Sequence, residues 1–308
     1  MATSGSTNYV QNRNQIITEA AELCGIKDFE EDLTANEISS CARSLEMMVK
    51  HWQARDIGLW KTKTVYVFLS DAGYEYDLGP TGDHATLSFT KTETSAAAVT
   101  GATTISVDSI TGISDNDHIG IELASGDIQW TTADGDPSGT TVTFDDALTG
   151  DVEVDASVFA YTTIIDRPLY ITDARLYRDG SANETPVKIV SRKKYNAISN
   201  KTSTGPANQL YYDPQQTNGK LYVWPSANWV KDYLILTARM PVEDFDSATN
   251  DPDFVQEWLL ALSWNLACFI APKFNVRLPG DFQIRAESLL QDMIGFDKDY
   301  GSIYFEVE

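Results

Sequence analysis

A chain of 308 residues, of which 42% are hydrophobic, can form one large or two ordinary globular domains. Its formal net charge of −22 argues against a nucleic-acid-binding function, which needs clustered lysine and arginine side chains to neutralise phosphates. No apolar run is long enough to span a bilayer and the N-terminal segment lacks the features of a signal peptide, so we expect a protein made in the cytoplasm with no membrane partner.

The N-terminal part of the sequence predicts two amphipathic helices. The first covers Arg13–Cys24. The second begins at a capping box, in which the hydroxyl of Thr34 caps the helix and Glu37 follows three residues later. Apolar residues then recur at three- and four-residue steps, among them Leu45, Met48 and Trp52. Both helices should therefore contribute one face to a core.

The hydrophobic period changes after Trp60, where alternation and β-branched residues replace the helical spacing. Six segments predict strands: Thr64–Leu69, Gly73–Leu78, Arg167–Tyr177, Val187–Arg192, Leu221–Trp224 and Tyr233–Ala238. A short helix is predicted over Lys193–Lys201.

The composition is different between Thr92 and Asp166. This segment has no lysine or arginine but carries fourteen aspartate or glutamate residues, and it is rich in Thr, Ser, Gly and Val. Short β-type runs alternate with turn residues along it. We interpret the segment as a small all-β module, a barrel or a sandwich, inserted into a larger unit.

Asp251–Pro272 is the most apolar stretch and predicts one buried helix. Asp251 can cap it, Pro252 suits the first helical position, and Pro272 prevents its continuation. Its apolar stripe contains Trp258, Leu262, Leu266 and Ile270. A last helix is predicted over Phe282–Met293, followed by a C-terminal tail whose alternation indicates an exposed strand-like segment.

The predicted fold class is α+β: a helical bundle built from both chain ends, with a long β excursion that includes the inserted all-β module. Its expected core positions are Leu45, Met48, Trp52, Trp258, Leu262, Leu266 and Ile270. The predicted domains are residues 1–64 and 246–308 for the bundle with its C-terminal tail, 65–91 and 167–245 for a β-rich domain, and 92–166 for the acidic module.

Motifs that carry catalysis are absent from the sequence. It has no phosphate loop, dinucleotide fingerprint, nucleophile elbow or zinc-protease helix, and its three histidines are scattered. We therefore predict no enzyme activity and no cofactor.

One loop resembles part of an EF-hand calcium site. Oxygen-bearing residues stand at the ligand positions Asp134, Asp136, Ser138 and Asp145. The loop departs from the motif because its last position is Asp rather than Glu and its flanks predict strands. A hairpin turn rich in Asp, Gly, Pro and Ser explains the same residues, so both interpretations stay open.

Three segments together resemble the head-to-tail adaptor proteins of short-tailed bacteriophages, also called tail accessory or head-completion factors. They are Leu45–Gly58, Leu221–Pro225 and the run from Asp253 through Trp258 to Trp264-Asn-Leu-Ala-Cys-Phe-Ile-Ala-Pro272. The first and last segments are the more specific. The resemblance covers the helical ends well, covers Asp166–Phe245 moderately, and leaves Thr92–Asp166 as an insertion.

The resemblance implies a structural protein of the virion neck. It implies a twelve-fold homo-oligomeric ring beneath the phage portal protein, with a tail nozzle or hub protein below and DNA passing through the lumen without specific binding. In such adaptors the C-terminal segment docks on the portal. The corresponding residues are Phe296, Tyr300, Ile303, Tyr304, Phe305 and Val307, for which a disordered terminus is the alternative interpretation.

Two other functions stay open at this stage. A glycan- or receptor-binding tail component could use the β module, and aromatic residues near Lys220 could stack sugars or bases. These aromatic residues are Tyr211, Tyr212, Trp224 and Trp229, for which a place in a β-sheet core is the alternative interpretation. A glycan hydrolase could use a carboxylate pair such as Asp145–Asp146, although such pairs arise by chance in an acidic segment.

Overall fold

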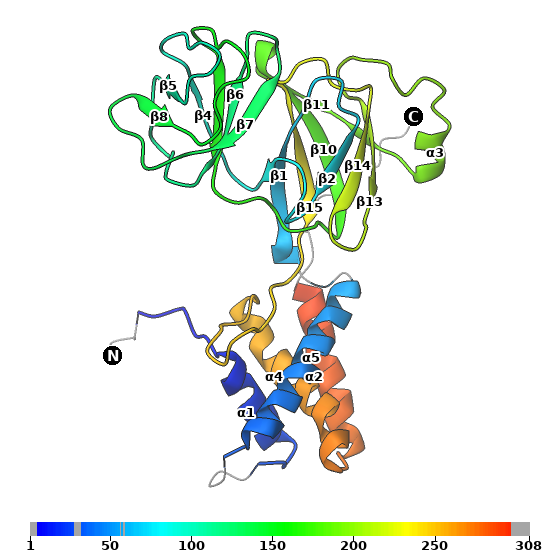
Figure 1. Cartoon of the computed structure of the whole chain (residues 1–308). Helices are drawn as coiled ribbons and strands as arrows, with labels where there is room; N and C mark the ends of the chain where they lie inside the picture. The colour runs from blue at the N-terminus through cyan, green and yellow to red at the C-terminus, as the bar shows by residue number, and fades with distance from the viewer. Residues whose placement is uncertain (1–4, 28–31, 56, 58, 297–308) are drawn as a thin grey trace. The chain divides into compact units, whose positions relative to one another are not determined.

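The computed structural model describes residues 5–27, 32–55, 57 and 59–296. The chain divides into two compact units (Figure 1). The helical unit consists of Met1–Lys61 together with Pro241–Glu308, and the β unit is Thr62–Met240. The β unit is thus one continuous stretch of sequence, whereas the helical unit combines the two ends of the chain.

The predicted α+β class, based on a helical bundle from both chain ends, is wrong. The described part of the chain is mostly β, with fifteen strands in four sheets and five short helices. Segments that the sequence presented as an excursion from a bundle instead form the larger unit. The reason is that these strands enclose hydrophobic cores of their own and do not depend on the helices for burial.

Four helices make up most of the helical unit: α1 (Arg13–Leu23), α2 (Ala35–Ala54), α4 (Leu259–Ile270) and α5 (Gly280–Phe296). Short 3₁₀ helices lie at Leu59–Lys61, Gln256–Trp258 and Ala271–Phe274. The capping box predicted at Thr34 and Glu37 is present on α2, and Asn12 with Gln15 forms a second one on α1.

The predicted start of the central helix is wrong. The α-helix begins at Leu259 rather than next to Asp251, and Val255 is still extended. The segment before it is held by side-chain contacts: the Asp253 carboxylate forms an ion pair with Lys61 at 2.5 Å and accepts a hydrogen bond from the backbone N–H of Glu243. Its carbonyl accepts from the indole of Trp60 at 3.0 Å. These tertiary contacts outweigh the local helix-start signal.

The β unit contains a sandwich of two sheets. Sheet 1 has the order β11-β10-β15-β1-β3 and sheet 2 has the order β12-β13-β14-β2. The strands of sheet 1 are β1 (Thr62–Phe68), β3 (Ala85–Thr86), β10 (Tyr170–Arg178), β11 (Asn183–Pro186) and β15 (Tyr233–Arg239). The strands of sheet 2 are β2 (Glu75–Leu78), β12 (Lys188–Ile189), β13 (Gln209–Asp213) and β14 (Gly219–Trp224).

Alternation along the strands gives each sheet an inner and an outer face. Val65, Leu234 and Leu221 belong to the core between the two sheets. Residues an odd number of positions away along the same strand, such as Phe68 on sheet 1 and Tyr222 on sheet 2, therefore project from the opposite faces.

The acidic segment forms a separate layer on the outer face of sheet 1. It has a four-stranded sheet, β4-β9-β6-β7, and a two-stranded one, β5-β8. Its strands are β4 (Thr90–Glu93), β5 (Thr104–Ser106), β6 (His118–Glu122), β7 (Ile128–Thr132), β8 (Thr141–Thr143) and β9 (Ser157–Tyr161). It encloses its own core, which includes Ile119, Phe144 and Val158. Ile165, near the end of the predicted module range, lies instead in the sandwich core.

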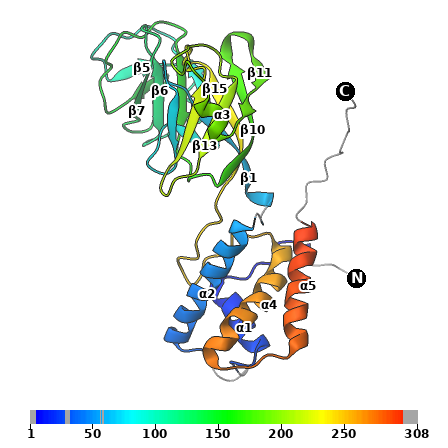
Figure 2. The same ribbon diagram turned by 90° about the vertical axis from the view of Figure 1, so that its right-hand side faces the viewer.

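A cluster of aromatic side chains joins the module to the sandwich. Phe68 of β1 lies 5.1 Å from Phe159 of β9 and 5.0 Å from Trp130 of β7, measured between ring centroids. Phe89, Tyr161 and Tyr233 also belong to the cluster. The remaining helix, α3 (Arg192–Asn196), packs near β13 on the outer face of sheet 2. Figures 1 and 2 show that the β unit is thus layered as module, sheet 1, sheet 2 and α3.

Candidate functional site

The seven residues predicted for the helical core are all buried. Trp258, Leu262, Leu266, Ile270, Leu45 and Met48 have no exposed surface, and Trp52 is 3% exposed. The ring centroids of Trp52 and Trp258 lie 5.8 Å apart, and Trp60 packs on Trp258 at 5.4 Å. These residues are core rather than a ligand-binding site.

The predicted docking tail falls almost entirely outside the described residues. Phe296 is the last residue of α5, and its side chain is 57% exposed. Tyr300, Ile303, Tyr304, Phe305 and Val307 lie outside the part of the chain that the structure describes.

The structure places the calcium candidates in exposed turns of the acidic module. Asp134, Asp136, Ser138 and Asp145 are all exposed. The carboxylate of Asp136 accepts a hydrogen bond from the backbone N–H of Asp115 at 3.0 Å. Within the described ranges, no group of three or more His, Cys, Asp or Glu side chains is arranged to hold a metal ion. The hairpin backbone is closed by a hydrogen bond from Asp134 to the Thr143 carbonyl.

The carboxylate pair considered for hydrolysis also lies in this hairpin. Asp145 and Asp146 are both exposed and follow β8 after one intervening residue, Phe144. Their backbone N–H groups donate to the Thr132 carbonyl and the Thr131 hydroxyl, at 3.0 and 3.1 Å. Their backbone contacts thus serve to close the hairpin.

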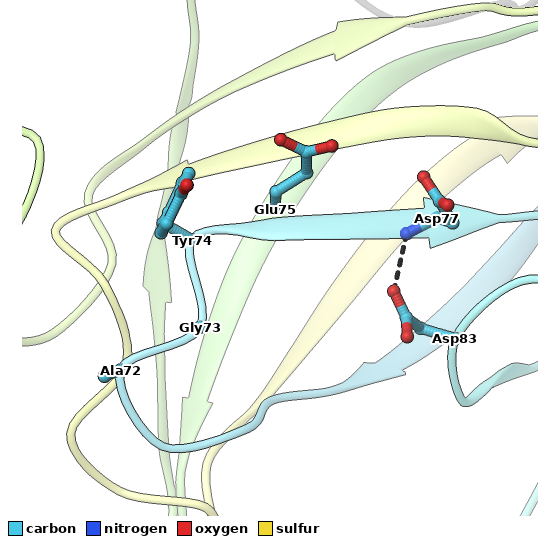
Figure 3. Close-up of a pocket in the computed structure, with 6 residues that line it drawn as sticks. All are labelled: Ala72, Gly73, Tyr74, Glu75, Asp77 and Asp83. Atoms are coloured by element: carbon cyan, nitrogen blue, oxygen red, sulfur yellow. Dashed lines mark hydrogen bonds between the residues drawn. The ribbon is translucent and has the colours of Figure 1, made fainter.

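An open pocket of about 310 Å³ lies beside the edge strand β2 (Figure 3). Its lining residues are Ala72, Gly73, Tyr74, Glu75, Asp77 and Asp83. The carboxylate of Asp83 accepts a hydrogen bond from the backbone N–H of Asp77 at 2.7 Å. Lys220 of β14 donates to Glu75 at 2.6 Å and to Asp77 at 3.0 Å, and these hydrogen bonds raise the pKa of its ammonium group. Two of the three lining carboxylates are therefore already paired.

Tyrosine side chains form a face on the outer side of sheet 2. Tyr211 and Tyr222 are register partners on β13 and β14 and stack at 5.8 Å with an interplanar angle of 10°. Tyr195 of α3 packs on Tyr222 at 5.4 Å. Arg192 lies over the ring of Tyr211 at 5.7 Å and donates to its hydroxyl at 2.9 Å. This tyrosine face (Tyr195, Tyr211 and Tyr222) combines aromatic surface with positive charge.

Of the aromatic residues considered near Lys220 in the sequence, Tyr211 and Trp224 project from the outer face of sheet 2, on the same side as Tyr222. Tyr212 points to the opposite side and donates to the Pro168 carbonyl at 2.5 Å, and Trp229 lies in a loop with 52% of its side chain exposed. Tyr222 was missed, although its alternation with the buried Leu221 and Val223 identifies an outward position.

Two histidines meet at the joint between module and sandwich, a contact that the sequence did not predict. The ring of His84 stacks on Trp130 at 3.8 Å, and its Nδ1 lies 2.6 Å from the hydroxyl of Tyr161. The ring centroids of His118 and His84 lie 5.9 Å apart. Burial, reinforced by the charge of His118, lowers the pKa of His84 from its ordinary value of 6.5 to about 4.

Comparison with known proteins gives no relative: no protein-family model and no curated protein sequence matches this chain. None of the helices in the described ranges is long and apolar enough to cross a membrane.

Proposed function

We propose that this chain is a structural adaptor of the phage virion neck. Copies of it form a homo-oligomeric ring, twelve-fold as the resemblance implies, between the portal protein and the tail nozzle or hub. The ring forms part of the channel through which DNA is ejected. In this function the chain binds proteins and carries out no catalysis, and it needs no cofactor.

One observation supports this proposal more than any other. The two more specific segments of the resemblance, which begin at Leu45 and at Asp253, lie about two hundred residues apart in the sequence. Their tryptophans pack together in one core, with Trp52 and Trp258 at 5.8 Å. Because the two segments meet in one hydrophobic core, their packing depends on each other. Their joint resemblance to the adaptor proteins therefore supports a shared fold more strongly than motifs on separate surfaces would.

The charge of the chain is compatible with a DNA channel. Each copy carries a formal net charge of −22, so a ring of copies repels phosphate groups. DNA can pass such a lumen without being held by it, because tight binding requires basic side chains that neutralise phosphates.

The docking role of the C-terminal tail can be tested by truncation after Phe296. We expect the truncated chain to keep its fold, since α5 ends at that residue, and to lose binding to purified portal rings. Co-sedimentation with portal rings measures this directly. Binding of the truncated chain as strong as that of the full chain would assign portal docking to another surface.

A second candidate function is glycan binding, which the tyrosine face favours. Tyr211 and Tyr222 are half-buried, so part of each ring is available to stack on a sugar, and charged groups such as Lys220 and Asp213 can bind hydroxyls. The sequence suggested the β module for this role. The geometry favours sheet 2 instead, because the stacked tyrosines lie there. Glycan-array binding that Tyr222→Ala abolishes would support this alternative over the adaptor.

A further inference from the structure

One short stretch of the β unit is strongly basic. Between Lys188 and Lys201 the chain has five lysine or arginine residues and no aspartate or glutamate, although its formal net charge is −22. This stretch contains β12, α3 and the loops beside them. The stretch is therefore positively charged, although the chain as a whole is negatively charged.

The stretch is anchored to sheet 2 in a way that leaves three lysines free. Tyr195 is 3% exposed, and Arg192 is held by Tyr211 and by an ion pair with Asp213. The side chains of Lys188, Lys193 and Lys194 are exposed, and none of them forms an ion pair with a described residue. We call these three lysines the basic face.

The opposite charge is presented by the turns of the acidic module. We define the acidic loops as Asp115, Asp134, Asp136, Asp145 and Asp146, which are all exposed. Of the fourteen acidic residues of the module, Glu122 is the only one that pairs with a lysine or arginine within the described ranges, at 3.1 Å from Lys231. The acidic loops therefore present a group of exposed carboxylates that form no ion pair with a described residue.

The two charged surfaces cannot neutralise each other within one chain. The module covers the outer face of sheet 1, and α3 lies on the outer face of sheet 2, so the whole sandwich separates them (Figure 1). Packed sheets alone lie about 10 Å apart, and at physiological ionic strength charges are screened over about 8 Å.

We infer that the basic face of one chain docks on the acidic loops of a second copy. Because the two surfaces differ and lie on opposite sides of the β unit, the contact is heterologous, and its repetition builds a ring or a filament. The inference rests on the proposed ring and identifies one contact within it.

Charge complementarity favours a second copy over other occupants. Two chains of net charge −22 repel each other, so association requires a local match of opposite charges, which also fixes the register of the contact. DNA approaching the basic face would be repelled by the remaining acidic surface of the same chain. The carboxylates of the module, by contrast, provide anions on the surface of every copy.

Charge-reversal variants of the full chain test this contact. The basic-face variant carries Lys188→Glu, Lys193→Glu and Lys194→Glu. The acidic-loop variant carries Asp134→Lys, Asp145→Lys and Asp146→Lys, and spares Asp115 and Asp136 because their carboxylates accept backbone hydrogen bonds.

Matched controls carry the same charge changes at other exposed positions. Arg43, Lys63 and Arg277 are changed to Glu in one control, and Glu93, Asp108 and Glu153 are changed to Lys in the other.

Sedimentation velocity should show concentration-dependent association of the wild-type chain. This association should weaken between about 0.1 M and about 1 M salt, because the screening length falls from about 10 Å to about 3 Å. Each contact variant alone should associate at least about tenfold more weakly, and the controls should not. An equal mixture of the two contact variants should regain association, because each contact between the two different variants again joins opposite charges. Rescue in this mixture cannot arise from misfolding.

Some outcomes would overturn the inference. One is that the contact variants associate as strongly as the wild-type chain. The proposed ring would then stand, but its subunits would meet through other surfaces. Another is a basic-face variant that associates normally and loses only its binding to duplex DNA. Charge-dependent association without any binding to portal rings would instead keep this contact and reject the adaptor function.

Discussion

Trp258 shows how one side chain can matter for its bulk rather than for its polar group. It is completely buried among Trp52, Trp60 and Phe254, yet its indole N–H has no hydrogen-bond partner among the described residues. A buried donor without a partner lowers stability, so the contribution of this residue comes from packing.

Trp258→Ala should therefore lower the free energy of unfolding by about 3–5 kcal/mol, whereas Trp258→Phe should cost less than about half of that, because it keeps a ring and removes the unpaired donor. Denaturant unfolding followed by far-UV circular dichroism measures both. Trp229→Ala, at a half-exposed position, is the control and should change stability by less than about 0.5 kcal/mol. Equal losses for the Ala and Phe variants would mean that the indole N–H does have a partner.

His84 makes the joint of the β unit sensitive to pH. Its pKa in the folded chain is about 4, below its ordinary value of 6.5, so the unfolded chain binds the proton more tightly. Stability is then complete above about pH 6.5 and is lost as the pH falls towards about 4, by about 2–3 kcal/mol in total. His84→Phe should remove this dependence and keep the stack on Trp130. His51→Asn, on α2, should leave the dependence unchanged, and a wild-type chain equally stable at both ends of this range would contradict the assignment.

At the scale of elements, the module is attached to the sandwich through a short antiparallel pair of strands. Thr92 of β4 and Val158 of β9 are register partners, so a deletion between Lys91 and Phe159 can be closed with a short Gly/Ser linker. Phe89 and Phe159 stay in place in this variant and continue to cover Phe68.

We expect this deletion to leave the helices and the sandwich folded, because the module encloses a separate core. It should also increase the binding of a hydrophobic dye, since Phe68 loses its contact with Trp130. Circular dichroism and dye fluorescence of the full-length and deleted chains provide the measurement. Loss of the helical signal on deletion would show that the helices depend on the module.

Elements with a local signal could be predicted from the sequence, and elements that depend on distant contacts could not. The capping box at Thr34 fixes the start of α2 through neighbouring residues, and this prediction is confirmed. Asp251 and Pro252 carry an equally local signal, yet Asp253 is bound to Lys61, almost two hundred residues earlier in the chain. No pattern around Asp251 records that ion pair.

At the scale of the whole molecule, strand pairing decided the fold class. β15 lies between β1 and β10, with Thr62 opposite Arg239 and Tyr170 opposite the same residue. Such pairing joins the two ends of the β unit and makes it an independent body. Periodicity identified most of these strands, but it carries no information about which strands are neighbours. The sequence therefore did not show that the β unit is the larger, independent body. The same limit applies to the tyrosine face, whose members come from α3, β13 and β14.

Electron microscopy of the chain mixed with purified portal rings can show whether copies of this chain form a ring on the portal. We expect portal particles that carry an additional closed ring at one end. Portal particles that remain unchanged in the presence of excess chain, at low as well as at high salt, would contradict it.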